Sequence, residues 1–63
     1  MKIKTVYFQS SVPGLNNSAT AGASVFSIDF NPEEECVNIV KNDGSEVIVP
    51  RDNVNSMLPM KGE

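Results

Sequence analysis

Asn42-Asp43-Gly44 lies between two runs rich in β-branched residues, 36–40 and 45–50, and this pattern is the strongest local constraint on the fold. Asn, Asp and Gly tolerate the left-handed backbone of tight hairpin turns, so the segment predicts a β-hairpin. A two-residue loop would scatter apolar side chains over both hairpin faces. A three-residue loop with Gly44 left-handed pairs Ile39 with Val47 and Val37 with Val49. That register collects one apolar face, and we predict it.

Hydrophobic periodicity predicts further strands. In residues 24–31, Phe26, Ile28 and Phe30 alternate with polar residues, which is typical of a half-buried strand. Residues 2–9 are rich in β-branched and aromatic side chains and predict another strand. Residues 51–54 are too few for an α-helix and fit a 3₁₀ turn, which leads to a last short strand at 55–58.

Residues 10–23 are small, uncharged and mostly polar, and we predict that they form a long flexible loop. The expected fold is all-β: one domain over residues 1–63, built as a small five-stranded barrel. Closure of the barrel would remove strand edges that the thin core of a 63-residue chain cannot protect. The side chains expected to point inward are Val6, Phe8, Phe26, Ile28, Phe30, Val37, Ile39, Val47, Val49 and Val54.

Residues 43–50, followed by Asn53 and Val54, resemble the end of a Src-homology-3-like barrel. In that family a distal hairpin leads to a strand, a proline, a 3₁₀ turn holding an Asn, and a final strand. The resemblance implies a fold and no specific function. Peptide-binding members carry an Ala-Leu-Tyr-Asp-Tyr-type run and a paired Trp, whereas this chain has one Tyr and no Trp. The chain also resembles small single-barrel proteins of unknown function encoded by bacteriophages.

Composition argues against several classes of function. The chain has no His and one Cys, so a His-containing catalytic triad, a disulfide framework and a Cys-rich zinc site are excluded. Three glutamates precede Cys36 and disfavour its thiolate, so we interpret it as a structural residue. The net charge of −3 argues against nucleic-acid binding. We expect no enzyme, no cofactor, no metal and no membrane span, and a cytoplasmic location, in the host cytoplasm if a bacteriophage encodes the chain.

The favoured hypothesis is a non-enzymatic module that binds another protein or a second copy of itself. A bacteriophage-encoded inhibitor or accessory factor that acts on a host protein is one version of it. The chain has no charged residue from Thr5 to Ile28, and uncharged surface suits an interface between copies. The residues expected to bind the partner are Tyr7, Val12, Leu15, Asn16, Asn17, Arg51 and Met57. The alternative is an oligomer that binds a small ligand or nucleotide in a pocket between protomers, formed by residues 10–23 and Arg51.

Overall fold

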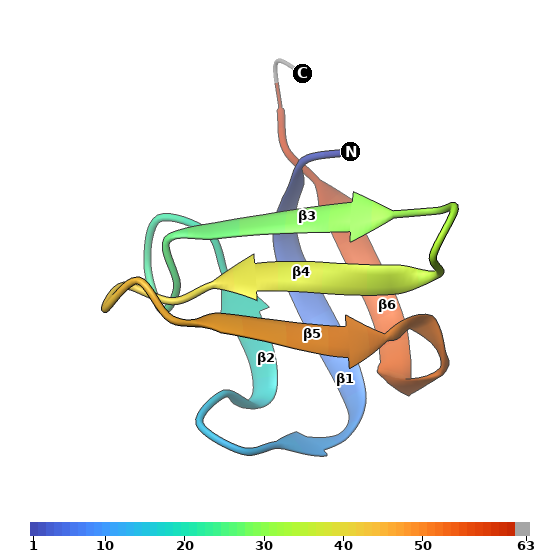
Figure 1. The fold of residues 1–63 in the computed structure, drawn as a ribbon, viewed down its shortest axis with the longest axis horizontal. Coiled ribbons are helices and arrows are strands. Elements are labelled where there is room, and N and C mark those ends of the chain that lie inside the picture. Colours follow the sequence, from blue (N-terminus) through green and yellow to red (C-terminus); the bar gives the residue numbers. More distant parts are fainter. Residues whose placement is uncertain (62–63) are drawn as a thin grey trace.

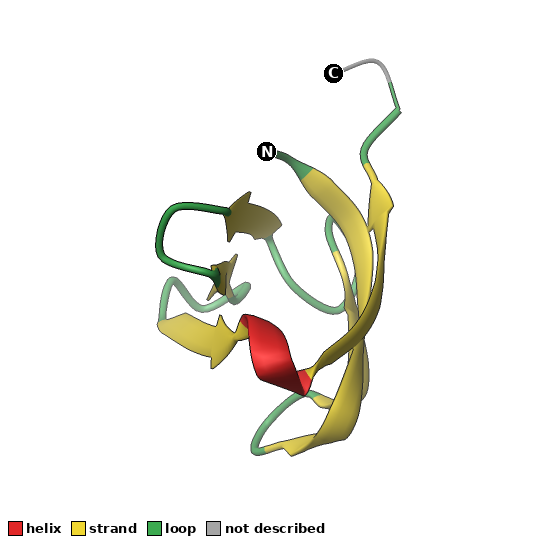
Figure 2. Ribbon diagram, turned by 90° about the vertical axis from the view of Figure 1, so that its right-hand side faces the viewer, coloured by secondary structure: helices red, strands yellow, loops and turns green. Residues whose placement is uncertain are grey.

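The computed structural model describes residues 1–61 and contains six strands in two antiparallel sheets (Figure 1). One sheet has the order β2–β1–β6 and the other the order β3–β4–β5. The sheets face each other as two layers (Figure 2). The elements are β1 (Ile3–Val12), β2 (Asn16–Thr20), β3 (Ser27–Asn31), β4 (Cys36–Val40), β5 (Glu46–Pro50), the 3₁₀ helix η1 (Arg51–Asn53) and β6 (Val54–Pro59).

The all-β prediction is confirmed, and the prediction of a five-stranded closed barrel is wrong. Within the described residues the two sheets stay separate, and they meet along one corner at the start of β1. There the amide of Phe30 donates to the Met1 carbonyl at 2.9 Å, and the Met1 amino group donates to the Phe30 carbonyl at 3.1 Å. Lys2 lies opposite Asp29 in an isolated antiparallel bridge.

The β4–β5 hairpin has the predicted register. Val37 pairs with Val49 and Ile39 with Val47, and the amide of Lys41 donates to the carbonyl of Ser45 at 2.8 Å across the mouth of the turn. Gly44 has a φ of +91°, as the three-residue loop requires. The turn chemistry therefore fixes which face of this sheet turns inward.

Residues 10–23 are not a flexible loop. β1 continues to Val12, and β2 returns from Asn16 and pairs with β1. The turn between them is short, with the amide of Leu15 donating to the carbonyl of Val12 at 2.9 Å. Val12, Leu15 and Ala19 are buried and supply the apolar contacts that hold this hairpin. The polar composition of this segment predicts a loop. Burial of Val12, Leu15 and Ala19 instead holds β2 against β1 as an edge strand.

The side chain of Asn53 binds the backbone of β1 near the C-terminal end of that strand. Its side-chain Oδ1 accepts from the amide of Ser10 at 2.9 Å, and its Nδ2 donates to the carbonyl of Ser10 at 3.2 Å. η1 is thereby tied to the first strand, and the amide of Arg51 donates to the carbonyl of Glu35 at 2.9 Å. The 3₁₀ turn predicted at 51–54 is confirmed at residues 51–53, where it links the two layers.

The core lies between the layers, and most of the predicted set is buried. Phe30 and Val47 are only partly buried and pack against the rest of the core. The predicted residues that are buried are Val6, Phe8, Ile28, Val37, Ile39, Val49 and Val54. The buried apolar residues that the prediction missed are Ile3, Val12, Leu15, Ala19, Ala21, Val25 and Cys36. Thr5 is also buried, but on the side of its sheet that faces away from the core.

Phe26 was predicted to be buried, and this is wrong: 69% of it is exposed. The chain turns over residues 21–25, where the amide of Gly22 donates to the carbonyl of Val25 at 2.8 Å. This turn directs Val25 into the core, so the next side chain faces solvent. The alternation of inward and outward side chains holds only within β3, and β3 begins at Ser27, after Phe26.

We therefore predict that Ile28→Ala destabilises the protein far more than Phe26→Ala does. Ile28 is 1% exposed, and its truncation leaves a cavity that costs about 2–5 kcal/mol. Phe26→Ala removes a mostly hydrated ring and should change the free energy of unfolding by about 0.5 kcal/mol or less. Urea unfolding of the two variants measures both values. A larger loss in the Phe26 variant would contradict this assignment of the core.

We predict that Gly44→Val destabilises the hairpin by about 1–2 kcal/mol, while Gly44→Asn costs less. A Cβ added at Gly44 meets no atom within 4 Å, so any cost arises from the left-handed backbone and not from crowding. Asn adopts that conformation readily, which makes it the matched control. Equal stability of the Val and Asn variants in urea would show that Gly44 is not held at positive φ.

Candidate functional site

The side of the β2–β1–β6 sheet that faces away from the core carries two uncharged rows of side chains, which we call the outer face. In one row Tyr7 lies between Ser18 of β2 and Ser56 of β6. In the other row Thr5 lies between Thr20 and Leu58. Tyr7 is 42% exposed and Leu58 is 50% exposed, so the face presents two large side chains among small hydroxyl groups.

A register shift between β1 and β6 shapes one end of the outer face. Ile3 pairs with Pro59 and Thr5 with Leu58, so Lys4 is an extra residue in β1. Ile3 is 1% exposed and points into the core, whereas Lys4 is exposed. An extra residue of this kind lets consecutive side chains leave the sheet on the same side. The irregularity thereby brings a cation to the edge of an uncharged surface.

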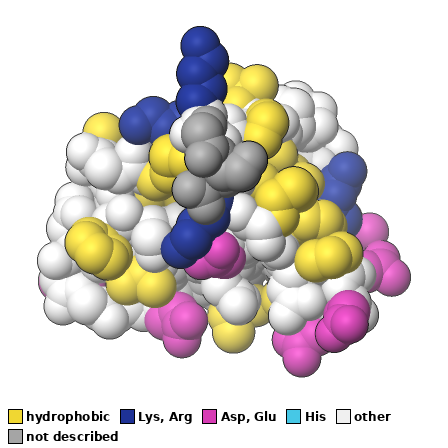
Figure 3. Space-filling model, turned by 90° about the horizontal axis from the view of Figure 1, so that it is seen from above, with side chains coloured by type: hydrophobic (Ala, Val, Ile, Leu, Met, Phe, Trp, Pro, Cys, Tyr) yellow, Lys and Arg dark blue, Asp and Glu magenta, His cyan; other side chains and the backbone are white. Residues whose placement is uncertain are grey.

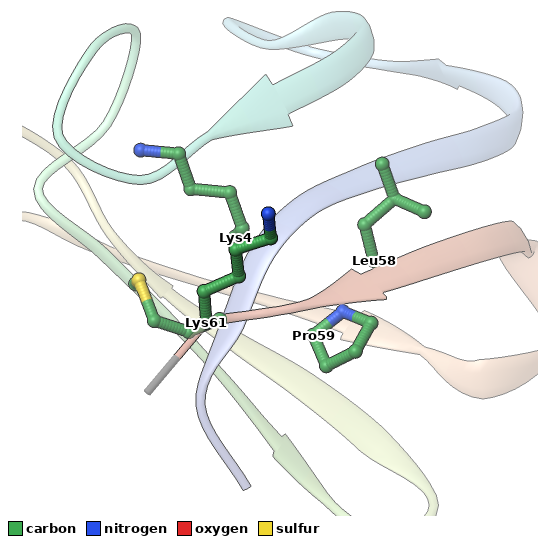
Figure 4. A pocket seen from close by; sticks show the side chains of 5 residues that line it. Lys4, Leu58, Pro59 and Lys61 are labelled. Carbon is green, nitrogen blue, oxygen red and sulfur yellow. The ribbon is translucent and has the colours of Figure 1, made fainter. Parts of the chain in front are cut away.

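A groove of about 570 Å³ continues the outer face toward the chain termini. Figure 4 shows Lys4 and Lys61 on one side of this groove and Leu58 and Pro59 on the other. Met60 completes the lining and also packs against the core. The groove therefore combines an apolar wall with two ammonium groups, and we call it the lysine groove.

A smaller hollow of about 230 Å³ lies next to the lysine groove and shares Met60 with it. Its lining includes the exposed Phe26 and the aliphatic part of Lys2, whose Nζ lies 3.7 Å from Asp29 Oδ2. Lys4 Nζ donates to the carbonyl of Ala21, another residue of this hollow, at 3.0 Å. In Figure 3, hydrophobic and basic side chains are spread over the face seen from above, while most acidic side chains lie along its lower and right-hand edges.

Apart from Arg51, the residues predicted to bind a partner fall into three groups. Val12 and Leu15 are 8% and 7% exposed and belong to the core, which leaves little of either side chain for a partner to contact. Met57 is half-buried and packs against the core. Tyr7, Asn16 and Asn17 are exposed, with Tyr7 on the outer face and the two asparagines on the edge strand β2.

Arg51 belongs to η1, which contacts β1 through Asn53 and lies away from the β1–β2 turn. Figure 1 places η1 on the right and the β1–β2 turn at the lower left. The guanidinium of Arg51 donates to the carbonyl of Val54 at 3.1 Å, so this side chain makes an intramolecular hydrogen bond at the start of β6. In this chain η1 therefore lies near the start of residues 10–23 and away from the β1–β2 turn, and the pocket between protomers in the alternative hypothesis stays a prediction.

Sequence reasoning missed the residues that line the lysine groove. The sequence predicts Leu58 in a short last strand without indicating its face, and it predicts Lys4 within a regular strand. The two lysines are 57 positions apart in the sequence. Only the pairing of β1 with β6 brings them together, and the sequence signal for that pairing is weak.

Cys36 is buried, and its Sγ lies 3.7 Å from Asn38 Oδ1. This position fits the structural role expected for it. Among residues 1–61, no three His, Cys, Asp or Glu side chains are grouped in a way that could hold a metal ion. No helix in this same part of the chain is long and apolar enough to cross a membrane.

Comparisons with known protein families, curated proteins and solved structures give no match to this chain.

We predict that Ser45→Ala raises the pKa of Asp43 toward its ordinary value. The Ser45 hydroxyl donates to Asp43 Oδ1 at 2.7 Å and the Ser45 amide donates at 2.9 Å, and these bonds lower the pKa of the Asp43 carboxyl. A carboxyl whose pKa is lowered by folding stabilises the fold above its unfolded pKa, and this contribution is lost as the pH falls through the folded pKa. NMR titration of the Asp43 side chain measures the shift. An unchanged titration curve in the variant would contradict the turn geometry.

Proposed function

We propose that the protein is a non-enzymatic interaction module that binds a protein partner through the outer face. One observation carries the proposal: a sheet face without a charged side chain in its two central rows exposes Tyr7 and Leu58. Interface cores are depleted in charge and enriched in aromatic residues, and Tyr combines apolar area with a hydroxyl for hydrogen bonding. The small Ser and Thr side chains around Tyr7 allow a partner to approach the sheet closely.

The edges of the sheet support this proposal. β2 and β6 are the outermost strands of their sheet, and each has a neighbouring strand only on the side of β1. Unpaired strand edges favour contact with another chain. The partner is either another protein or a second copy of this chain, and a bacteriophage-encoded inhibitor of a host protein remains one version of the first case.

The order of the last elements supports the resemblance to Src-homology-3-like barrels. A β4–β5 hairpin leads through Pro50 and η1 to β6, and β6 pairs with β1. The proline-rich peptide groove of that family is not part of our proposal, because the aromatic residues that line it have no counterpart here. The proposed site lies instead on the outer face.

Site-specific photocrosslinking in cells that naturally contain the protein tests this proposal. A benzoylphenylalanine at position 7 should yield covalent protein adducts on irradiation, because the Tyr7 side chain lies in the proposed interface. The same probe at position 48 is the matched control, since Ile48 is 64% exposed but lies in the other sheet. The mass of the adduct separates a second copy from a different protein.

Adducts at position 7 and few at position 48 would support the outer face as the binding surface. Absence of adducts at position 7, or equal yields at the two positions, would contradict it. Thermal unfolding of both labelled proteins checks that each probe leaves the fold intact. This check matters at position 7, because Tyr7 lies in the central strand of its sheet.

A further inference from the structure

The lysine groove has a composition that selects an acidic segment. Lys4 and Lys61 form one side of it and Leu58 and Pro59 the other (Figure 4), and Met60 completes the lining. A segment that enters this groove meets positive charge on one side and an apolar wall on the other. Negative charge on the entering segment favours the contact, because complementary charges select a partner and like charges oppose it.

The same chain carries an acidic segment of this kind in the turn between β3 and β4. Pro32, Glu33, Glu34 and Glu35 are all exposed. Asn31 Oδ1 accepts from the amides of Glu33 and Glu34 at 3.1 and 3.2 Å, so the turn is held in one conformation before it meets a partner. Among residues 1–61 the structure contains one ion pair, between Lys2 and Asp29, and none of the three glutamates takes part in it.

We propose that the lysine groove of one molecule binds the acidic turn, residues 32–35, of a second copy. In this contact the glutamates face Lys4 and Lys61, and the ring of Pro32 faces the apolar wall. Residues from the start of β1 and from the end of β6 onward line the groove, whereas the turn joins β3 to β4 at one end of the other sheet (Figure 1), so the two surfaces are different parts of the molecule. A contact between two different surfaces is head-to-tail, and repeated use gives a ring or an open chain.

A second copy is the occupant that the charges of this chain favour. The net charge of −3 makes molecules of this protein repel one another at long range, yet three of its five cations, Lys2, Lys4 and Lys61, lie at the end with the groove. This uneven distribution favours one relative orientation of two copies and disfavours the others. The contact uses different residues from the Tyr7 row of the outer face, so it goes beyond the proposed function and can fail separately.

Sedimentation equilibrium of neutralised variants tests the inference. One variant carries Lys4→Gln with Lys61→Gln, and the other carries Glu33→Gln with Glu34→Gln and Glu35→Gln. The native protein in about 50 mM salt should show an average mass above the monomer that rises with concentration, and about 500 mM salt should weaken the association by about tenfold or more. Each variant alone should be monomeric, because each lacks one of the two complementary surfaces.

An equimolar mixture of the two variants gives the decisive result. The first variant retains an intact turn and the second an intact groove, so the mixture should form a one-to-one dimer that grows no further. The control variant, Lys41→Gln with Glu46→Gln, changes charges outside both surfaces and should associate like the native protein. Circular dichroism confirms that every variant is folded. The three substituted glutamates lie on an exposed turn, so we expect that variant to fold. If the Lys4 variant is unfolded, the mass of the glutamate variant still tests whether the acidic turn is needed for association.

Three results would overturn the inference: a native protein that is monomeric at both salt concentrations, neutralised variants that still associate, or a mixture that stays monomeric. Tyr7→Ser separates this inference from the proposed function. If Tyr7→Ser abolishes association while the lysine and glutamate variants keep it, the outer face joins the copies and the groove does not. If Tyr7→Ser associates like the native protein and the mixture forms the dimer, the groove contact stands without the outer face.

Discussion

The fold depends on β1, because this ten-residue strand is paired along both of its edges. It pairs with β2 on one side and with β6 on the other, and Met1, just before the strand, bonds to Phe30 of β3. The side chains that it sends inward, including Ile3, Val6 and Phe8, occupy the middle of the core. A chain of this length buries a smaller fraction of its surface on folding than a larger domain does, so one strand that contacts three others gives more cohesion than local hairpins alone. Loss of either edge of β1 would expose the core to water.

The parts of the fold that local chemistry determines could be predicted from the sequence. Asn42-Asp43-Gly44 has one good turn geometry, and that geometry together with the apolar face determined the register of β4 and β5. The errors arose where tertiary contacts override composition. Polar residues 16–20 form a strand because β1 offers a pairing edge and the core accepts Ala19. The turn at 21–25 reverses the expected faces, so the core takes Val25 and leaves the larger Phe26 outside.

The candidate site could be predicted only in part, for a similar reason. The absence of charge from Thr5 to Ile28 correctly suggested an uncharged surface, and Tyr7 lies on it. The lysine groove needs the pairing of β1 with β6 and the extra residue at Lys4, and both are long-range properties of the folded chain. A loop over residues 10–23 would leave Val12 and Leu15 available to a partner. Hairpin formation turns both of them inward, so the interface that we propose uses residues on the opposite side of the same sheet.

The central claim is that β1 lies between β2 and β6 and carries Tyr7 on a sheet face directed at solvent. Nuclear Overhauser effects between backbone protons test this claim most directly. The account predicts contacts from Tyr7 to Ser18 on one side and to Ser56 on the other, because these residues are cross-strand partners in the sheet. Contacts from Tyr7 to Ser56 alone, with residues 10–23 showing the averaged signals of a flexible loop, would contradict it.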